Sequence, residues 1–345
     1  MDQLPSKDNL FTLLTALFLY ICKQERVEAA ILEVGIGGEF DATNAVKNPV
    51  VCGINTLELD HCDILGETIQ EIAWHKAGIM KRGVPVFTIP QQKSEAIEIL
   101  RERAAEKGAS LSFAAPMEGY KNHEKLGIGA EVQHKLLNAS LAVALCKEWL
   151  IKCRRIEGAH FDLDDKFIKG LTTVEQLGRN QTVNVNENLT FYLDGAHTNK
   201  SVQYALEWFE SKVKGKDSSA MKILVFIPPV TREPSAMLAT LHGSNFDKVF
   251  FTPSCVVEPG RVTTVKELEK AEEFSYEEAL EHRRKCVESW SGLKNIKPAV
   301  ECKSVLDTFE NIKEISQHHK ADVFVVGSFN LAGSFLRVIS SELST

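Results

Sequence analysis

Side chains capable of chemistry lie at or just beyond the ends of four apolar runs of this 345-residue sequence. The runs are 27–34, 49–56, 189–195 and 322–328, and the side chains are, in that order, Glu33, the pair Asp60 and His61, Asp194 with His197, and Ser328. Each alone has a plain structural explanation, such as a helix cap or a hydrogen-bonded histidine. In open α/β sheets, however, ligands bind beyond the carboxyl ends of the strands. The recurrence therefore favours an active site formed between two α/β domains.

The stretch ILEVGIGGEFDATN, residues 31–44, could be a phosphate-binding loop, a tight turn or a loop that presents Glu33. A dinucleotide fingerprint needs G-x-G-x-x-G directly between a strand and a helix, and a P-loop needs Lys followed by Ser or Thr. The stretch has neither pattern. We expect the glycines to let the backbone turn closely past a ligand while Glu33 points into the site, where its carboxylate suits Mg²⁺.

Lys76 is the other unusual residue, because helical spacing places it on the apolar side of a helix predicted over 67–83. A lysine in that position can extend its ammonium group to the surface. Its place on the core-facing side, and its closeness in sequence to His61, make a functional role at least as reasonable.

Composition is that of a globular protein, with 44% hydrophobic and 25% charged residues. The formal net charge of −7 argues against a general nucleic-acid-binding protein, which needs a basic face. The eight cysteines form no CxxC pair, and we interpret them as reduced thiols of a cytosol-like compartment. The apolar segment 10–22 is too short to span a bilayer and lacks the features of a signal peptide, so we expect a buried amphipathic helix.

Apolar runs alternate with helical patterns along most of the chain, which is typical of doubly wound α/β domains. The expected strands are 27–34, 49–56, 84–89, 189–195, 222–227, 248–253 and 322–328. The expected helices, besides 10–22, are 67–83, 94–108, 199–213, 262–290, 304–318 and 331–342. The less patterned stretch 154–188 carries the domain boundary, which we place at 178/179.

Five motifs occur in order over nearly the whole chain: EVGIGGEFDATN, LDHCDILGETIQEIAWHKAGI, GR at 178–179, YLDGAHT and VGSFNLAGSFL. Together they resemble the folylpolyglutamate synthases, members of the Mur-ligase-like family of ATP-dependent amide ligases. The resemblance implies an α/β fold in which 1–178 is a truncated Mur-ligase-type ATPase domain. Residues 179–345 would be a smaller, Rossmann-like, doubly wound C-terminal domain. The implied reaction adds glutamate to the γ-carboxylate of tetrahydrofolate, through an acyl phosphate made with ATP, and so extends a poly-γ-glutamyl chain.

The resemblance also implies roles for residues of the first domain. Glu33 and His61 match the magnesium ligands of the family. Lys76 matches the lysine that is carbamylated to bridge a metal, which converts a cation into an anionic oxygen ligand. Asp41 matches a position linked to catalysis.

In the second domain, the resemblance implies that Arg179 and Asp194 hold ATP. Asp194 would accept hydrogen bonds from the ribose or the base. His197 matches a position linked to catalysis, and Ser328 matches one that holds the incoming glutamate.

The family places a P-loop of the type GTNGKGS before the helix with which this sequence opens, and GxxxxGK[ST] does not occur in these 345 residues. We therefore expect very weak or absent ligation. The alternatives are a catalytically inactive paralogue or fragment that acts as a binding protein, and a sibling ligase of the dihydrofolate synthase type. A nicotinamide-dependent enzyme ranks lowest, because the fingerprint spacing is missing.

The ligands implied by the resemblance are Mg²⁺, ATP, a reduced folate and L-glutamate. We expect no nucleic-acid partner, no membrane span, and a monomer. The expected compartment is the cytoplasm, with a mitochondrial form if a transit peptide precedes this sequence.

Overall fold

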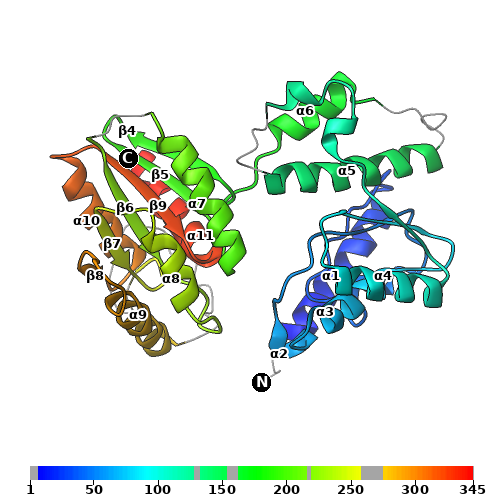
Figure 1. Cartoon of the computed structure of the whole chain (residues 1–345), viewed down its shortest axis with the longest axis horizontal. Coiled ribbons are helices and arrows are strands. Elements are labelled where there is room, and N and C mark those ends of the chain that lie inside the picture. The colour runs from blue at the N-terminus through cyan, green and yellow to red at the C-terminus, as the bar shows by residue number, and fades with distance from the viewer. Residues whose placement is uncertain (1–6, 128–132, 154–161, 216–218, 258–274, 345) are drawn as a thin grey trace. The chain divides into compact units, whose positions relative to one another are not determined.

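The computed structural model describes residues 7–127, 133–153, 162–215, 219–257 and 275–344 (Figure 1). Contacts divide the chain into two compact units. The first unit contains Met1–Ile128 and Gln133–Thr172, and the second contains Thr173–Thr345. Both units combine parallel strands with helices, so the predicted α/β class is confirmed. The assignment of 1–178 and 179–345 to an ATPase domain and a C-terminal domain stays a prediction.

The first unit contains a three-stranded parallel sheet in the order β1-β2-β3. Its strands are β1 (Cys52–Ile54), β2 (Pro85–Thr88) and β3 (Ser110–Phe113). Its helices near the sheet are α2 (Cys62–Leu65), α3 (Ile69–Lys76) and α4 (Ser94–Lys107), with short 3₁₀ helices η1 (Ala42–Ala45) and η2 (Ala77–Ile79). Val86, at the centre of β2, is fully buried in a core that includes Ala73 and Leu100. Helix α3 starts at a capping box of Thr68 and Glu71, as the sequence pattern T-x-x-E predicts.

A second, smaller core of the same unit lies beneath α5 (Gln133–Lys152) and α6 (Asp165–Thr173). The 3₁₀ helices η3 (Met117–Gly119) and η4 (His123–Leu126) contribute Met117 and Leu126 to it. These elements were not predicted from the sequence, although the apolar side chains of α6 follow a clear helical period.

The segment 27–34 was predicted as a strand, and this prediction is wrong, because the segment has no strand structure. A strand needs a neighbouring strand to pair its backbone N–H and C=O groups. Within the described residues, β1 is the edge strand of the sheet and pairs with β2 alone. Ile31 is consequently 92% exposed.

Helix α1 (Lys7–Gln24) forms where a helix was predicted, but its predicted burial is wrong. Eight of its large apolar side chains are 39–60% exposed: Leu10, Phe11, Leu13, Leu14, Leu17, Phe18, Tyr20 and Ile21. Leucine and alanine favour a helix through local propensity even where packing contributes little. None of the helices in the described ranges combines the length and the hydrophobicity needed to cross a bilayer. All eight cysteines are free thiols, which confirms that they form no disulfide framework.

The second unit contains a six-stranded sheet in the order β4-β5-β9-β6-β7-β8. Its strands are β4 (Gln181–Asn186), β5 (Leu189–Asp194), β6 (Met221–Phe226), β7 (Lys248–Phe251), β8 (Ala299–Glu301) and β9 (Ala321–Val326). Only β4 is antiparallel, at the edge beside β5. The central strand β9 is buried along its whole length, as a parallel strand covered on both faces must be. The predicted strands of this half, in β5, β6, β7 and β9, are confirmed.

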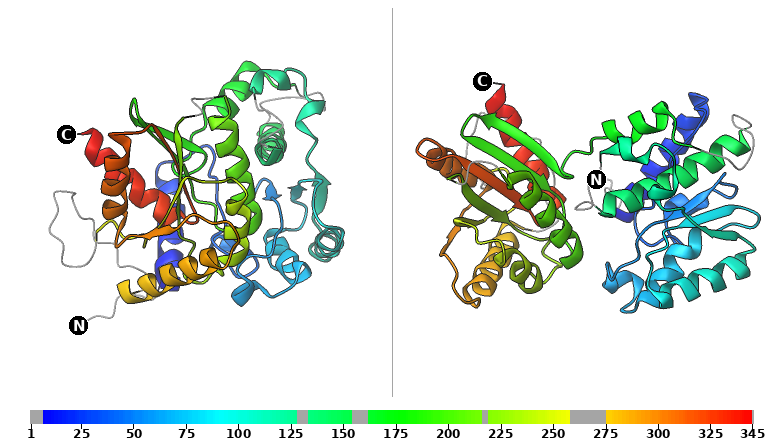
Figure 2. Two further views of the ribbon diagram at one scale, coloured as in Figure 1. Left: turned by 60° about the vertical axis from the view of Figure 1, so that its left-hand side comes forward. Right: turned by 45° about the horizontal axis from the view of Figure 1, so that its top comes forward.

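Helices cover both faces of this sheet (Figure 2). They are α7 (Asn199–Val213), α8 (Ser235–His242), α9 (Tyr276–Ser291), α10 (Val305–Ser316) and α11 (Phe329–Leu343). Right-handed crossovers place α7, α8 and α9 on one face, because they lead across the sheet from β5 to β8. Helix α10 leads back to β9 and packs with α11 on the other face. Of the helix predicted over 262–290, the part 262–274 lies outside the described residues.

Strands β5 and β9 are neighbours, and the helices that follow them lie on opposite faces of the sheet. Their carboxyl ends therefore form a topological switch point, where such sheets leave a crevice for ligands. The register places Asp194 beside Val326, so the segment that contains Gly327 and Ser328 begins next to Asp194.

Candidate functional site

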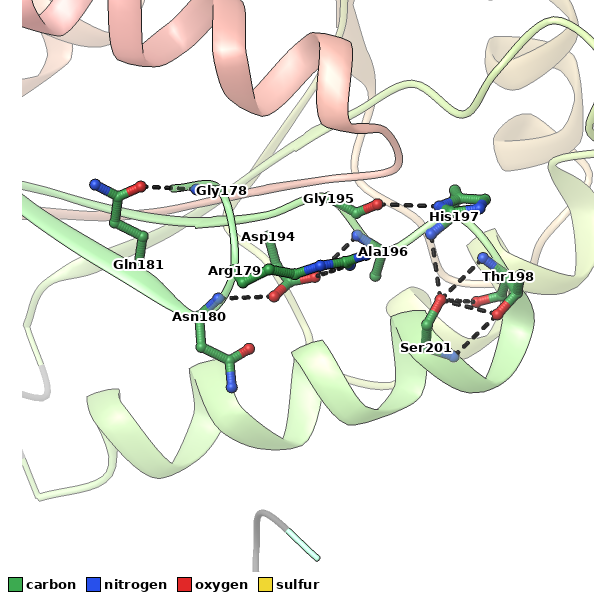
Figure 3. Close-up of polar contacts among 10 residues, drawn as sticks. All are labelled: Gly178, Arg179, Asn180, Gln181, Asp194, Gly195, Ala196, His197, Thr198 and Ser201. Carbon is green, nitrogen blue, oxygen red and sulfur yellow. Dashed lines mark hydrogen bonds and ion pairs between the residues drawn. The ribbon is translucent and has the colours of Figure 1, made fainter. Parts of the chain in front are cut away.

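Asp194 is the centre of a buried polar cluster at this switch point (Figure 3). Its Oδ2 accepts the backbone N–H of Asn180 at 2.8 Å, and its Oδ1 accepts the backbone N–H of Ala196 at 2.8 Å. The carboxylate is only 6% exposed. Burial raises the pKa of Asp194 above its ordinary value, and the two N–H groups and Arg179 oppose that shift. The carboxylate therefore serves mainly to hold the groups around it.

Arg179 is the most accessible charged group of this cluster. Its Nη1 lies 3.5 Å from Oδ1 of Asp194, and its guanidinium carbon lies 3.9 Å from the centre of the Phe329 ring. The arginine side chain is 38% exposed. The turn that carries it is tied to the end of β5, because the N–H of Gly195 donates to the carbonyl oxygen of Gly178 at 2.7 Å. The sequence predicted both Arg179 and Asp194, and the structure brings them together.

Two glycines allow the strand ends to approach each other. A Cβ atom at Gly195 would lie 2.6 Å from the ring of Phe329. At Gly327, which has φ of +125°, a Cβ atom would lie 2.4 Å from the carbonyl oxygen of Ile227, at the end of β6. Larger residues at either position would separate the elements that form the site.

His197 and Ser328 stand at the starts of the two helices that leave the switch point. The Nδ1 of His197 lies 3.1 Å from the carbonyl oxygen of Gly195, so the ring donates from Nδ1 to that oxygen. Thr198 and Ser201 form the capping box of α7 beside it. Ser328 caps α11, and its Oγ accepts the N–H of Leu331 at 3.2 Å. Ser328 is only 5% exposed, and its hydroxyl group serves as the cap at the start of α11.

In the first unit, the glycines of the opening stretch pack against a helix. A Cβ atom at Gly38 would lie 2.9 Å from the carbonyl oxygen of His75, and the N–H of Glu39 donates to that same oxygen at 2.8 Å. A Cβ atom at Gly78 would lie 2.3 Å from Cα of Glu39. The glycines were predicted to let the backbone approach a ligand closely. In the structure the backbone instead approaches the carboxyl end of α3.

Three predicted residues of this region lie in different settings. Glu33 is exposed and follows no strand, so its predicted place at a strand end is wrong. Asp41 caps η1, and its carboxylate accepts the N–H groups of Ile36 and Thr43 at 3.0 and 2.9 Å. His61 adopts φ of +53°, a left-handed conformation uncommon outside glycine, and its Nε2 lies 3.9 Å from Oδ2 of Asp60.

Lys76 is the last residue of α3, and burial lowers the pKa of its ammonium group. Among the described residues, its ammonium group forms no ion pair or hydrogen bond. The buried side of α3 is formed by Ile69, Ile72 and Ala73, and Lys76 at the end of the helix is partly buried. A charged group without a counter-ion in such a setting is unusual for a purely structural lysine.

The described residues contain no group of three or more histidine, cysteine, aspartate or glutamate side chains that could hold a metal ion. The assignment of Glu33 and His61 as magnesium ligands stays a prediction. A cavity of about 470 Å³ lies beside α3 and is lined by residues that include Leu65, Trp74 and His75. None of the eight predicted site residues lines it.

Two members of the cluster at the switch point, Asn180 and Phe329, were not predicted from the sequence. The signal for Asn180 is its place after Gly-Arg, since asparagine tolerates the left-handed conformation that it adopts at φ of +42°. Phe329 carries no such local signal, because its partner Arg179 is 150 residues away in the sequence.

Comparisons with known proteins agree with this fold. The folylpolyglutamate synthase of Saccharomyces cerevisiae is 34% identical over 352 residues, covering 96% of this chain and 61% of the yeast protein. The structure of Mycobacterium tuberculosis folylpolyglutamate synthase complexed with ADP and AMPPCP matches with a TM-score of 0.70 and 20% identity, covering 95% of this chain and 72% of that one. A bifunctional folylpolyglutamate synthase/dihydrofolate synthase of Yersinia pestis, complexed with AMPPNP and a Mn ion, matches with a TM-score of 0.62 and 22% identity, covering 95% and 69%. No family model matches the chain.

The parallel sheets with their flanking helices define an α/β protein that shares the fold of these solved structures. The chain is similar to the folylpolyglutamate synthases over 96% of its own length, at 34% identity to the yeast protein. The chain spans 61% of the length of the curated relatives that it matches.

Proposed function

We propose that this chain acts in the ATP-dependent addition of glutamate to the γ-carboxylate of tetrahydrofolate, through an acyl phosphate. The observation that supports this proposal most is the Arg179–Asp194 pair at the switch point of the second unit. A planar guanidinium group that is held in place but remains 38% exposed suits the recognition of a phosphate. The named homologues supply the reaction in which such a group is needed.

Arg179 would contact the nucleotide directly, and Asp194 would act mainly by holding Arg179 and the turn at 178–180. This division follows from their exposed fractions, 38% for the arginine and 6% for the aspartate. Asp194 also accepts N–H groups of the backbone with both oxygen atoms. A ribose hydroxyl group that donates to Asp194 would therefore have to share a carboxylate oxygen with one of these backbone N–H groups.

His197 and Ser328 would serve the incoming glutamate. The amino group of glutamate must lose a proton before its nitrogen forms the amide bond and phosphate leaves the acyl phosphate. Because Nδ1 of His197 donates to Gly195, Nε2 is the ring nitrogen suited to take up that proton. The start of α11, which Ser328 caps, favours a negatively charged group such as a glutamate carboxylate.

Lys76 would react with carbon dioxide to give a carbamate. Its lowered pKa increases the fraction of the neutral amine, which forms the N–C bond to carbon dioxide and releases one proton to solvent. The product carries a negative charge where the ammonium carried a positive one, and so becomes an oxygen ligand. Glu33, His61 and Asp41 are the further side chains that the proposal assigns to this region. Mg²⁺, when bound, would neutralise phosphate charge, and it commonly takes only one or two protein ligands.

We further propose that the protein acts as a monomer in the cytoplasm. The free thiols of all eight cysteines support a reducing compartment.

Calorimetric titration of this chain with Mg²⁺-ATP tests the proposal. We expect binding that is lost in Arg179→Ala and kept in Arg284→Ala, a matched control on α9 whose side chain is 61% exposed. Ligase activity is then measured as ADP formation that requires both tetrahydrofolate and glutamate. Failure of the unmodified chain to bind ATP would overturn the proposal. Binding of ATP or folate without ADP formation would instead support an inactive binding paralogue.

A further inference from the structure

We propose that Phe329 is a positioning residue that fixes the guanidinium group of Arg179 in the orientation in which it meets an anionic ligand. This inference rests on the proposed function of Arg179. It assigns a role to a residue that carries no polar group.

The first argument is that Asp194 alone does not fix the arginine. Strong charge-assisted hydrogen bonds between nitrogen and oxygen measure about 2.7–2.9 Å. The contact from Nη1 of Arg179 to Asp194 is longer, at 3.5 Å. A guanidinium group that is held at one edge, at this distance, can still rotate about that edge. A second contact is needed to define its plane.

The ring of Phe329 supplies that second contact. At 3.9 Å between the guanidinium carbon and the ring centre, the two groups are stacked. The stack covers one face of the guanidinium group and leaves part of the side chain exposed, at 38%. Asp194 and Phe329 thus restrain one edge and one face of Arg179, and the remaining N–H donors are available to a ligand.

The position of the ring is itself well determined. Phe329 is the first residue of α11, directly after the Ser328 cap, so the helix start fixes its backbone. The ring also fills the space in which a Cβ atom of Gly195 would lie, and it contacts the turn at Gly178. The ring therefore connects the end of β5, the turn that carries Arg179 and the start of α11.

The test compares Phe329→Leu, which keeps an apolar side chain but removes the aromatic face, with Phe329→Tyr, which keeps that face. Phe113→Leu is a matched control, because Phe113 is 39% exposed and Phe329 is 40% exposed. Mg²⁺-ATP affinity is measured by calorimetry for each variant, together with Arg179→Lys, Arg179→Ala and the double variant Arg179→Lys/Phe329→Leu. The Hε resonance of Arg179, identified by its absence in Arg179→Lys, reports the stack directly, because an aromatic ring shifts protons above its face upfield.

We expect Phe329→Leu to weaken ATP binding roughly three- to tenfold, as removal of a partly desolvated cation–π contact does. Phe329→Tyr should restore both the affinity and the upfield Hε resonance, and Phe113→Leu should change neither. In the Arg179→Lys background, Phe329→Leu should add little, because the planar group that the ring orients is already gone. Phe329→Met replaces Phe329→Leu if the latter lowers the melting temperature of the protein.

Two outcomes would overturn the inference in different ways. If Arg179→Ala abolishes binding while Phe329→Leu and Phe329→Met leave it unchanged, Phe329 has no positioning role and the proposed function stands. If Arg179→Ala also leaves binding unchanged, or the unmodified chain does not bind, the proposed function fails and this inference fails with it.

Discussion

Asp41 and Asp194 have the same local chemistry in different surroundings. Each follows a glycine-bearing or apolar segment, and each accepts two backbone N–H groups at 2.8–3.0 Å. Asp41 does this in a loop that packs on α3 through its glycines. Asp194 does it at a switch point in a sheet, where its carboxylate is buried and the positively charged, partly exposed Arg179 lies beside it. An aspartate that organises a turn therefore becomes a candidate site residue only when the tertiary structure adds a second charged group.

Two glycines of the second unit give the test with the largest expected effect. Gly327→Ala forces a Cβ atom against the backbone of Ile227 at a φ of +125°, and the neighbouring strand cannot move without loss of its pairing. We expect a loss of about 4 kcal/mol in the free energy of unfolding, from overpacking and backbone strain together. Gly215→Ala, at a φ of +81° with no atom within 4 Å, should cost only about 1 kcal/mol in the same unit. Urea unfolding measures both, and equal losses would contradict the assigned close approach.

The two aspartates themselves provide the second test. Asp194→Ala leaves two buried N–H groups and Arg179 without their acceptor, so we expect a loss of about 3 kcal/mol. Asp41→Ala removes the cap of a short 3₁₀ helix in a partly exposed loop, and should cost about 1 kcal/mol. Thermal unfolding followed by circular dichroism compares the two variants. A larger effect at Asp41 would reverse the comparison drawn above.

The buried lysine of the first unit leads to a prediction about alkaline pH. Burial lowers the pKa of Lys76 in the folded protein, so the unfolded chain holds more protons between that pKa and about 10.4, the ordinary value for lysine. Stability should therefore rise with pH across this window. Lys76→Met should remove this rise, whereas Lys248→Met, at an exposed position of β7, should keep it. A pH series of urea midpoints would contradict the prediction if the unmodified protein and Lys76→Met show the same slope.

The buried histidine of the second unit gives the smallest expected effect. Burial lowers the pKa of His282 below its ordinary value, with Lys285 adding to the shift while the carbonyl group of Pro228 and the carboxylate of Glu233 oppose it. The unfolded chain then binds more protons than the folded protein just below about pH 6.5. Stability contributed by the neutral ring should be lost as the pH falls through this window. His282→Gln should reduce that loss between pH 7 and pH 5, and an unchanged pH profile would assign the acid sensitivity to other groups.

Prediction from the sequence succeeded best where local pattern and burial agree. The strands β5, β6, β7 and β9 are apolar runs, as predicted, and the register places the end of β5 at Asp194 beside the end of β9 at Val326. It failed at 27–34, where the same kind of apolar run has no neighbouring strand among the described residues. It also failed for α1, whose helical period was correct but whose burial was not. In both cases the missing information is the identity of the neighbouring element, which no local pattern contains.

By itself, the sequence determined the strands β5, β6, β7 and β9, the helices α7, α10 and α11, and the residue types of the candidate site, because hydrophobic period, caps and strand ends are local properties. It also determined that Arg179 and Asp194 belong together, through the motifs that carry them. Only the tertiary structure decided that the opening glycines approach α3, that Asp194 is buried, and that Phe329 stacks on Arg179. These properties depend on contacts between segments far apart in the chain. Burial, and with it the free energy of a charge, is set by those contacts.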